Sequence, residues 1–194
     1  MDKAIEIREC EVASCPPNHP GRDSSFKKLA GLLQRRFDHS GLFLDLNKVT
    51  MCLEQALALH PPGHPDRPSS LSELAGTVYV CFQRSGQHSD LERTIELLEE
   101  ALVLSPRGHP ARAGSIRGLA IAINTRFNVS NEDSDLDKAI TLYEQVLDLC
   151  PAGHPDHTLT LRSLARVLET RFERLNQMSD PDRAIELHQE VLSA

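Results

Sequence analysis

The sequence has no tryptophan, and aromatic residues make up only 4% of its 194 residues. It has no apolar run near the ~18 residues that a membrane-spanning helix needs. Residues 1–5 lack the apolar core of a signal peptide. The five cysteines are odd in number and form no C-x-x-C pair. These absences argue against a membrane protein and a disulfide-rich secreted protein, so a reduced, cytoplasmic compartment is expected.

Two further classes of ligand find no support in the sequence. The ten glycines are scattered among turns and single helix positions, and they form no phosphate-binding loop. The formal net charge of −7 disfavours indiscriminate binding to nucleic acid. We therefore expect no nucleic-acid partner, no membrane partner and no cofactor.

What the sequence does contain is a repeat with a period of 45 residues. Short turns of the type Pro-Pro-Gly-His-Pro begin at Pro16, Pro61, Pro106 and Pro151. The same spacing relates three further sets: His19, His64, His109 and His154; Phe37, Phe82, Phe127 and Phe172; Asp45, Asp90, Asp135 and Asp180. Self-similarity at a fixed period of this size is typical of a stacked repeat protein, whose units pack on their neighbours.

Each 45-residue unit contains two segments whose apolar residues have helical spacing. In the second unit the first segment runs from about Asp66 to Arg84, and Gly86 follows it as a helix stop. The next segment opens with Ser89 and Glu92, the pattern of a capping box. The apolar stripe of the first segment consists of Leu71, Leu74, Ala75, Val78 and Phe82.

The full chain is expected to be an all-α solenoid of about nine helices. An opening helix at 2–14 corresponds to the second helix of a unit that lacks its first. Four pairs follow at about 20–61, 65–106, 110–151 and 155–194, so that residues 1–194 form a single array. Because terminal repeats normally carry a polar outer face, we expect the array to be part of a longer protein or to self-associate through its uncapped ends.

The second unit carries small and apolar residues at the signature positions of a known repeat. These are Leu71, Leu74, Ala75 and Val78 in its first helix and Thr94, Leu98, Ala101 and Pro106 in its second. The pairs resemble tetratricopeptide repeats, although the unit has 45 rather than 34 residues and alanine replaces the family's small glycine. The resemblance implies helical hairpins in a right-handed superhelix. The longer unit is similar to arrays in fungal and bacterial multidomain proteins, which often precede a caspase-like CHAT protease module.

The resemblance implies a protein–protein interaction scaffold that binds a peptide or partner domain in its concave groove. The alternative is the sensor segment of a CHAT-type protease whose catalytic domain lies outside these residues. In both cases the chain itself is expected to have no enzyme activity and no catalytic residue.

The turn histidines and cysteines are the candidates for metal or nucleophile chemistry. Equivalent histidines of neighbouring units lie roughly 10 Å apart, whereas zinc needs ligand atoms about 2 Å from one ion. We therefore expect no metal site, and imidazoles that bond the turn backbone or pack beside proline. Cys15 with His19, and Cys150 with His154, have the spacing of a nucleophile and its base, but the intervening prolines prevent a shared helical face.

Charge is divided between the two kinds of helix, because the first helices are rich in Lys and Arg and the second helices in Asp and Glu. Either the groove is basic and the outer face acidic, or the two sets of helices pair their charges, each exposed pair contributing about 0–1 kcal/mol. A helical wheel directs Arg36, Arg126 and Arg171 away from the groove, toward the acidic helices.

The same wheel gathers a set of residues on one flank of the first helices, and the resemblance implies that this flank opens on the groove. The predicted ligand-binding residues on this flank are Lys27, Gln34, Ser72, Tyr79, Arg117, Asn124, Arg162 and Arg166. Amides suit the backbone of an extended peptide and guanidinium groups suit its carboxylates, so the predicted ligand is a peptide with acidic character.

Two loop features complete the expectations. Gly63, Gly108 and Gly153, with Asn18 in the first unit, are expected at positive φ, where the chain reverses before each His-Pro step. The connection at residues 38–44 is more apolar than its counterparts, so it is expected either to pack down or to form part of a contact.

Overall fold

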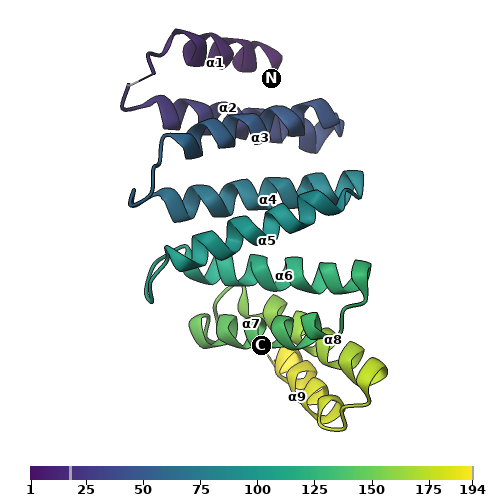
Figure 1. Cartoon of the computed structure of the whole chain (residues 1–194). Coiled ribbons are helices and arrows are strands. Elements are labelled where there is room, and N and C mark those ends of the chain that lie inside the picture. Colours follow the sequence, from purple (N-terminus) through teal and green to yellow (C-terminus); the bar gives the residue numbers. More distant parts are fainter. Residues whose placement is uncertain (18, 194) are drawn as a thin grey trace. The chain divides into compact units, whose positions relative to one another are not determined.

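The computed structural model describes residues 1–17 and 19–193, and this part of the chain forms nine α-helices and no β-strand. The chain divides into two compact units, Met1–Leu104 and Ser105–Ala194, and Figure 1 labels the helices of each. The first unit contains α1 (Asp2–Ser14), α2 (Arg22–Ser40), α3 (Phe43–Ala58), α4 (Arg67–Ser85) and α5 (His88–Val103). The second contains α6 (Arg112–Ser130), α7 (Ser134–Leu149), α8 (His157–Leu175) and α9 (Asp180–Ser193). The predicted all-α fold is confirmed.

Helices that follow one another in the sequence pack against one another. The pairs α2–α3, α4–α5, α6–α7 and α8–α9 make the most extensive contacts, and short connections join the two members of each pair. Within the first unit α1 also packs on α2 and α3 on α4, and within the second unit α7 packs on α8. Each unit is therefore a stack of helical hairpins.

The predicted apolar stripe of α4 lies in the core. Leu71, Leu74, Ala75 and Val78 are at most 2% exposed, and Phe82 is 9% exposed. Leu74 and Val78 belong to one cluster with residues of three other helices: Ile5 of α1, Leu29 and Leu33 of α2, and Val49 and Leu53 of α3. The core of this unit is thus shared between hairpins, because no single hairpin can bury its apolar face alone.

Positive backbone angles mark the turns where the sequence predicted them. Gly63, Gly108 and Gly153 have φ values of 90°, 89° and 90°, which confirms the prediction for these three residues, whereas Asn18 lies outside the described residues. Gly86 also has a positive φ, 70°, and its amide donates to the carbonyl of Phe82, which ends α4.

The predicted capping box at Ser89 is wrong. Helix α5 begins at His88 and has Gln87 at its N-cap, and the Gln87 side chain makes no capping hydrogen bond. Because the helix starts one residue before Ser89, that hydroxyl lies inside the first turn rather than at the cap position.

The apolar connection between α2 and α3 does not pack down. Leu42, Phe43 and Leu44 are 57%, 43% and 66% exposed, since α3 begins at Phe43 and leaves these side chains at the surface. The expectation that residues 38–44 pack down is therefore wrong, and the alternative, that they form part of a contact with a partner, stays a prediction. Among the described residues, none of the helices combines the length and the apolar character needed to cross a bilayer.

Candidate functional site

The turn histidines are held by the backbone of their own turns. Nδ1 of His19, His64, His109 and His154 accepts the backbone N–H of the residue two positions later, at 3.1 Å in every case. An imidazole nitrogen that accepts a hydrogen bond carries no proton, so the ring proton lies on Nε2. The expected bond between imidazole and turn backbone is confirmed.

The residue four positions before each turn histidine is fixed through its carbonyl group. Arg67 Nη1 donates to the carbonyl of His60 at 2.8 Å, and Arg22 and Arg112 make the same contact in their turns. In the fourth turn Nδ1 of His157 lies 2.7 Å from the carbonyl oxygen of Cys150.

The candidate nucleophile Cys150 does not have the properties of a catalytic thiol. Burial raises the pKa of the Cys150 thiol, which keeps this sulfur protonated. A catalytic cysteine needs the opposite shift.

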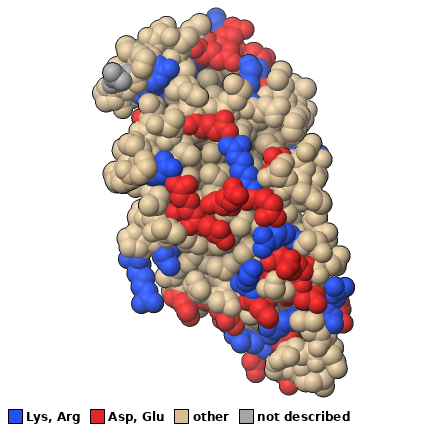
Figure 2. All heavy atoms as spheres, in the orientation of Figure 1, with Lys and Arg blue, Asp and Glu red and all other residues tan. Residues whose placement is uncertain are grey.

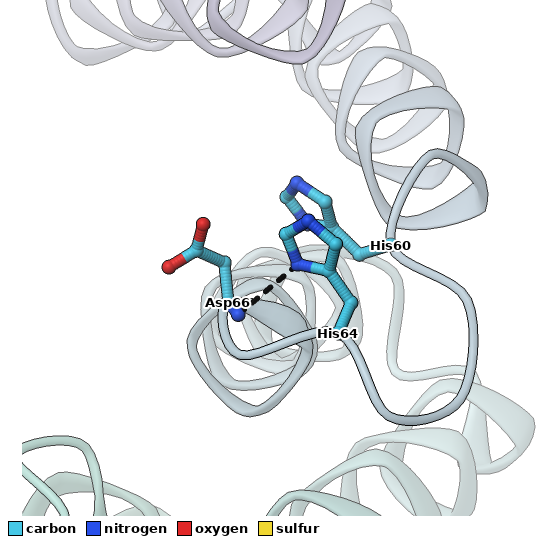
Figure 3. Close-up of side chains that lie close together, drawn as sticks. All are labelled: His60, His64 and Asp66. Carbon is cyan, nitrogen blue, oxygen red and sulfur yellow. Dashed lines mark hydrogen bonds between the residues drawn. The ribbon is translucent and has the colours of Figure 1, made fainter.

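The second turn differs because it has two histidines. His60 occupies the position that Cys15, Ser105 and Cys150 have in the other turns. Its ring stacks on His64, with centroids 4.3 Å apart and planes 17° apart, and Asp66 lies beside the pair (Figure 3). The two rings border a pocket of about 550 Å³.

The sequence prediction compared only equivalent histidines, so it missed this contact within one turn. Ligand atoms of His60, His64 and Asp66 come within 4.8 Å of one another, which raises the question of a metal ion. A metal binds in the plane of an imidazole at about 2 Å. The nearly parallel, stacked rings direct their lone pairs along separate planes, and Nε2 of His64 carries the proton because Nδ1 accepts the Asp66 N–H. The observed arrangement therefore does not suit a metal.

A second grouping around His60 has the residue types of a catalytic triad. Nδ1 of His60 lies 2.8 Å from the hydroxyl of Ser70, and Nε2 lies 3.5 Å from a carboxylate oxygen of Asp23. Ser70 and His60 are only 2% and 3% exposed, so a substrate carbonyl cannot reach the hydroxyl. The contacts satisfy the hydrogen bonds of two buried polar groups, and they are structural.

The same histidine makes the first unit sensitive to acid. Burial lowers the pKa of His60, and the neighbouring charges of His64 and Lys27 add to this effect against the opposing carboxylates of Asp23 and Asp66. Below the unperturbed value of about 6.5, the unfolded chain takes up a proton that the folded chain refuses. Stability is therefore complete above this pH and is lost as the pH falls toward the lowered pKa.

We expect the melting temperature to fall between about pH 7.5 and about pH 5.5, and the fall to be smaller in His60→Ser, which copies Ser105 of the third turn. The pKa of His157 is raised, chiefly by its hydrogen bond to Glu190, and this contributes stability at low pH. The measurement that isolates His60 is therefore the difference between the variant and the parent in how far the melting temperature falls with pH. Equal pH slopes in the two proteins would contradict the assignment to His60.

The predicted ligand flank of the first unit lies on two neighbouring helices. Lys27 and Gln34 are on α2, Ser72 and Tyr79 are on α4, and all four are partly exposed. The two helices come close enough for the guanidinium of Arg84 to lie 5.4 Å from the ring centre of Phe37.

The equivalent residues of the second unit differ in how accessible they are to a ligand. Arg162 and Arg166 are exposed on α8. Arg117 forms an ion pair with Asp156 at 3.0 Å, and Asn124 is only 8% exposed. Of the four predicted residues in this unit, the two arginines of α8 are therefore those most accessible to a ligand.

Two glycines lie inside the helices of the first-unit flank. Gly31 stands between Lys27 and Gln34, and Gly76, 45 residues later, stands between Ser72 and Tyr79. A Cβ added at either glycine would meet nothing within 4 Å, so packing within the chain does not require a glycine. Glycine inside a helix costs about 0.5–1 kcal/mol relative to alanine. Two such residues at equivalent positions leave the flank open to the close approach of another backbone.

Alanine at two different glycines should have opposite effects on stability. Gly76→Ala should raise the free energy of unfolding by about 0.5–1 kcal/mol, because the helix gains propensity without a clash. Gly63→Ala should lower it by about 1–2 kcal/mol, because φ is +90° there and a Cβ disfavours that conformation. Chemical denaturation of the two variants measures both changes, and effects of the same sign would contradict this account.

Arginine–aspartate pairs join the two helices of three hairpins. Arg36 binds Asp45, Arg126 binds Asp135 and Arg171 binds Asp180, each through two hydrogen bonds of 2.6–2.8 Å. The aspartates are 1–2% exposed. The prediction that these arginines point toward the acidic helices is confirmed. At these positions the pairing of charges between helices accounts for the charge pattern.

Comparison with solved structures supports the same architecture. The chain is similar over its full length to a protein from Podosopora anserina described as a putative kinesin light chain with nearly identical TPR-like repeats, at 23% identity, with 89% of that chain covered and a TM-score of 0.64. It is also similar over its full length to MamA, at 16% identity, with 91% of that chain covered and a TM-score of 0.63. No protein-family model and no curated protein matches the chain. In fold, the chain is a TPR-like helical repeat protein.

Proposed function

We propose that this protein is an interaction scaffold of the tetratricopeptide-repeat kind, and that the flank of its first helices binds an extended peptide segment of a partner. The observation that carries the proposal is the pair Gly31 and Gly76, which leave open space on α2 and α4 at a cost in helix stability. The loss of helix stability at the two glycines is explained if the backbone of a ligand lies against these positions, because only a residue without a side chain lets it approach so closely.

The polar residues around the glycines suit the backbone of a peptide. Gln34 and Ser72 are partly exposed; the Gln34 amide donates to Asp38 at 2.8 Å and the Ser72 hydroxyl to the carbonyl of Pro68 at 3.0 Å, so each brings an acceptor oxygen to the flank, and Tyr79 adds a partly exposed ring. An extended segment has unpaired N–H and C=O groups along its length. Hydrogen bonds to amides and hydroxyls satisfy these groups without a demand for particular ligand side chains.

The charges of the flank set the chemical character of the ligand. Lys27 in the first unit and Arg162 and Arg166 in the second are the basic residues of the predicted set that remain accessible and form no ion pair with the described residues. Because guanidinium and ammonium groups bind carboxylates, the ligand is a peptide with acidic residues. Binding of this kind weakens as salt rises.

A peptide-display selection on the parent protein tests the proposal. Peptides that bind the parent should bind Gly76→Leu at least tenfold more weakly, because the leucine side chain fills the open space on α4. Glu99→Leu on α5 is the matched control, since it adds the same side chain at an exposed helical site away from the flank. The proposal fails if both variants bind the selected peptides as well as the parent does.

A further inference from the structure

The second hairpin lacks the arginine–aspartate pair of the other three. Residue 81 is the equivalent of Arg36, Arg126 and Arg171, and it is a cysteine, while the aspartate of the pair is retained as Asp90. The other three aspartates are 1–2% exposed. Asp90 is half-buried, and its carboxylate has a long contact of 3.5 Å with the hydroxyl of Ser85.

Neighbouring positions change together with residue 81. Arg36 and Arg171 each bind a second carboxylate on the preceding helix, that of Asp2 at 2.7 Å and that of Asp137 at 2.5 Å. The equivalent residue before the second hairpin is Asn47 of α3. A further equivalent position is Thr50, where α1, α5 and α7 carry a buried isoleucine: Ile5, Ile95 and Ile140. A neutral amide thus replaces the second carboxylate, and a smaller, more polar threonine replaces the isoleucine, beside the position of the missing guanidinium.

These substitutions leave a pocket of about 440 Å³ between α3, α4 and α5. Its lining includes Asn47, Thr50, Val78, Cys81, Ser85 and Asp90. Val78 is itself smaller than its equivalents, which are Leu33, Ile123 and Leu168. The pocket therefore occupies the position that an arginine side chain fills in the other hairpins.

The polar groups of the pocket include the carboxylate of Asp90, the side-chain amides of Asn47 and Gln87, and the hydroxyls of Thr50 and Ser85. The Asp90 carboxylate and the Asn47 amide oxygen accept, and the Cys81 sulfur lies 3.7 Å from the Thr50 hydroxyl. Burial raises the pKa of Cys81, so this thiol is neutral and adds no charge. The other charged residues of the lining, Glu54 and Arg93, neutralise each other through a contact of 2.5 Å. The pocket is left with one negative charge, that of Asp90.

The surroundings favour a cationic group attached to an apolar stem. Phe43 and Met51 line the pocket and are 43% and 63% exposed, and the neighbouring Leu44 is 66% exposed. Acidic side chains also gather over α5 (Figure 2), where Glu92, Glu96 and Glu99 are exposed; none of the three lines the pocket, so each adds only a weak, screened attraction for a cation. An arginine side chain combines a planar cation with an apolar stem that can lie along such a surface.

We propose that this pocket binds the guanidinium group of an arginine on a partner protein. In the complex, Asp90 binds the partner's guanidinium as Asp45, Asp135 and Asp180 bind an arginine within the chain. Its carboxylate accepts two parallel N–H···O bonds. Phe43 and Met51 contact the stem of the arginine and the residues beside it. The site lies between α3, α4 and α5, and it does not depend on peptide binding at the first-helix flank.

The test uses the full chain and two peptides that differ in one group. Acetyl-Leu-Arg-Leu-amide carries the guanidinium, and acetyl-Leu-citrulline-Leu-amide replaces it with a neutral urea of nearly the same shape. Two-dimensional ¹H–¹⁵N NMR should show the arginine peptide shifting amide signals of Thr50, Cys81 and Asp90, with an affinity at least tenfold above that of the citrulline peptide.

Variants assign the effect to the pocket. Asp90→Asn should weaken binding of the arginine peptide at least tenfold, whereas Glu96→Gln, which removes one exposed charge from the same helix, should leave it within about twofold, a difference of about 0.4 kcal/mol. Cys81→Arg should abolish binding and raise the melting temperature, because the chain then supplies the missing guanidinium itself.

Several results would overturn the proposal. These are equal affinities for the two peptides, no binding of the arginine peptide at millimolar concentration, unchanged binding by Asp90→Asn, or unchanged binding by a folded Cys81→Arg. None of these results bears on the peptide selected through the flank of α2 and α4, so the two proposals can fail separately.

Discussion

Replacing Leu74 with alanine should lower the free energy of unfolding of the first unit by about 2–5 kcal/mol. Leu74 is 1% exposed and belongs to the cluster that joins α4 to residues of α1, α2 and α3. The truncation removes apolar contacts and leaves a cavity among α1 and the hairpins α2–α3 and α4–α5, and the packed helices relax only partly to fill it. The loss is a large part of the 5–15 kcal/mol typical of a folded domain.

Chemical denaturation followed by circular dichroism measures this loss. Leu44→Ala is the matched control, because it removes the same atoms from a side chain that is 66% exposed, and it should change stability by about 0.5 kcal/mol or less. A Leu74→Ala protein as stable as the control would show that the hairpins do not share a core.

Replacing Arg171 with methionine should have an effect of similar size in the second unit. Asp180 is 2% exposed and accepts two hydrogen bonds from Arg171, at 2.8 and 2.7 Å. Removing one partner of a buried ion pair leaves an uncompensated charge and costs about 3–5 kcal/mol. The Arg171 side chain is 19% exposed, so water screens part of the field, and we expect the lower end, about 3 kcal/mol.

Two further variants separate this effect from general damage. The double variant Arg171→Met/Asp180→Leu should recover most of the loss, because an apolar pair no longer has a charge to bury. Arg183→Met breaks the exposed pair with Glu144 and should cost about 0–1 kcal/mol. Equal losses from Arg171→Met and Arg183→Met would refute a special role for the buried pair.

Local sequence was sufficient to predict the helices and their buried faces. The spacing of Leu71, Leu74 and Val78 depends only on the helical period, and the structure buries all three. The positive φ at Gly63 follows from the steric freedom of glycine. The direction of Arg171 follows from its place on the helical wheel. Each of these features is decided by residues within a few turns of one another.

Features that depend on contacts between elements were harder to predict. The stack of His60 on His64 requires the folded turn, and the pairing of Arg117 with Asp156 requires α6 to lie near the turn before α8. The capping box at Ser89 failed for a local reason, because the N-cap is Gln87 and the helix already begins at His88. The pocket at Cys81 does have a signal in the sequence, since residue 81 is the position where three units carry arginine.

The flank of the first helices is the surface that we propose binds the partner. An ¹H–¹⁵N NMR titration of the full chain with the tightest peptide from the display selection tests it most directly. In the first unit, the account predicts that the largest shifts lie on α2 and α4, at Lys27, Gly31, Gln34, Gly76 and Tyr79. Shifts confined to the acidic surface of α5, with α2 and α4 unchanged, would contradict it.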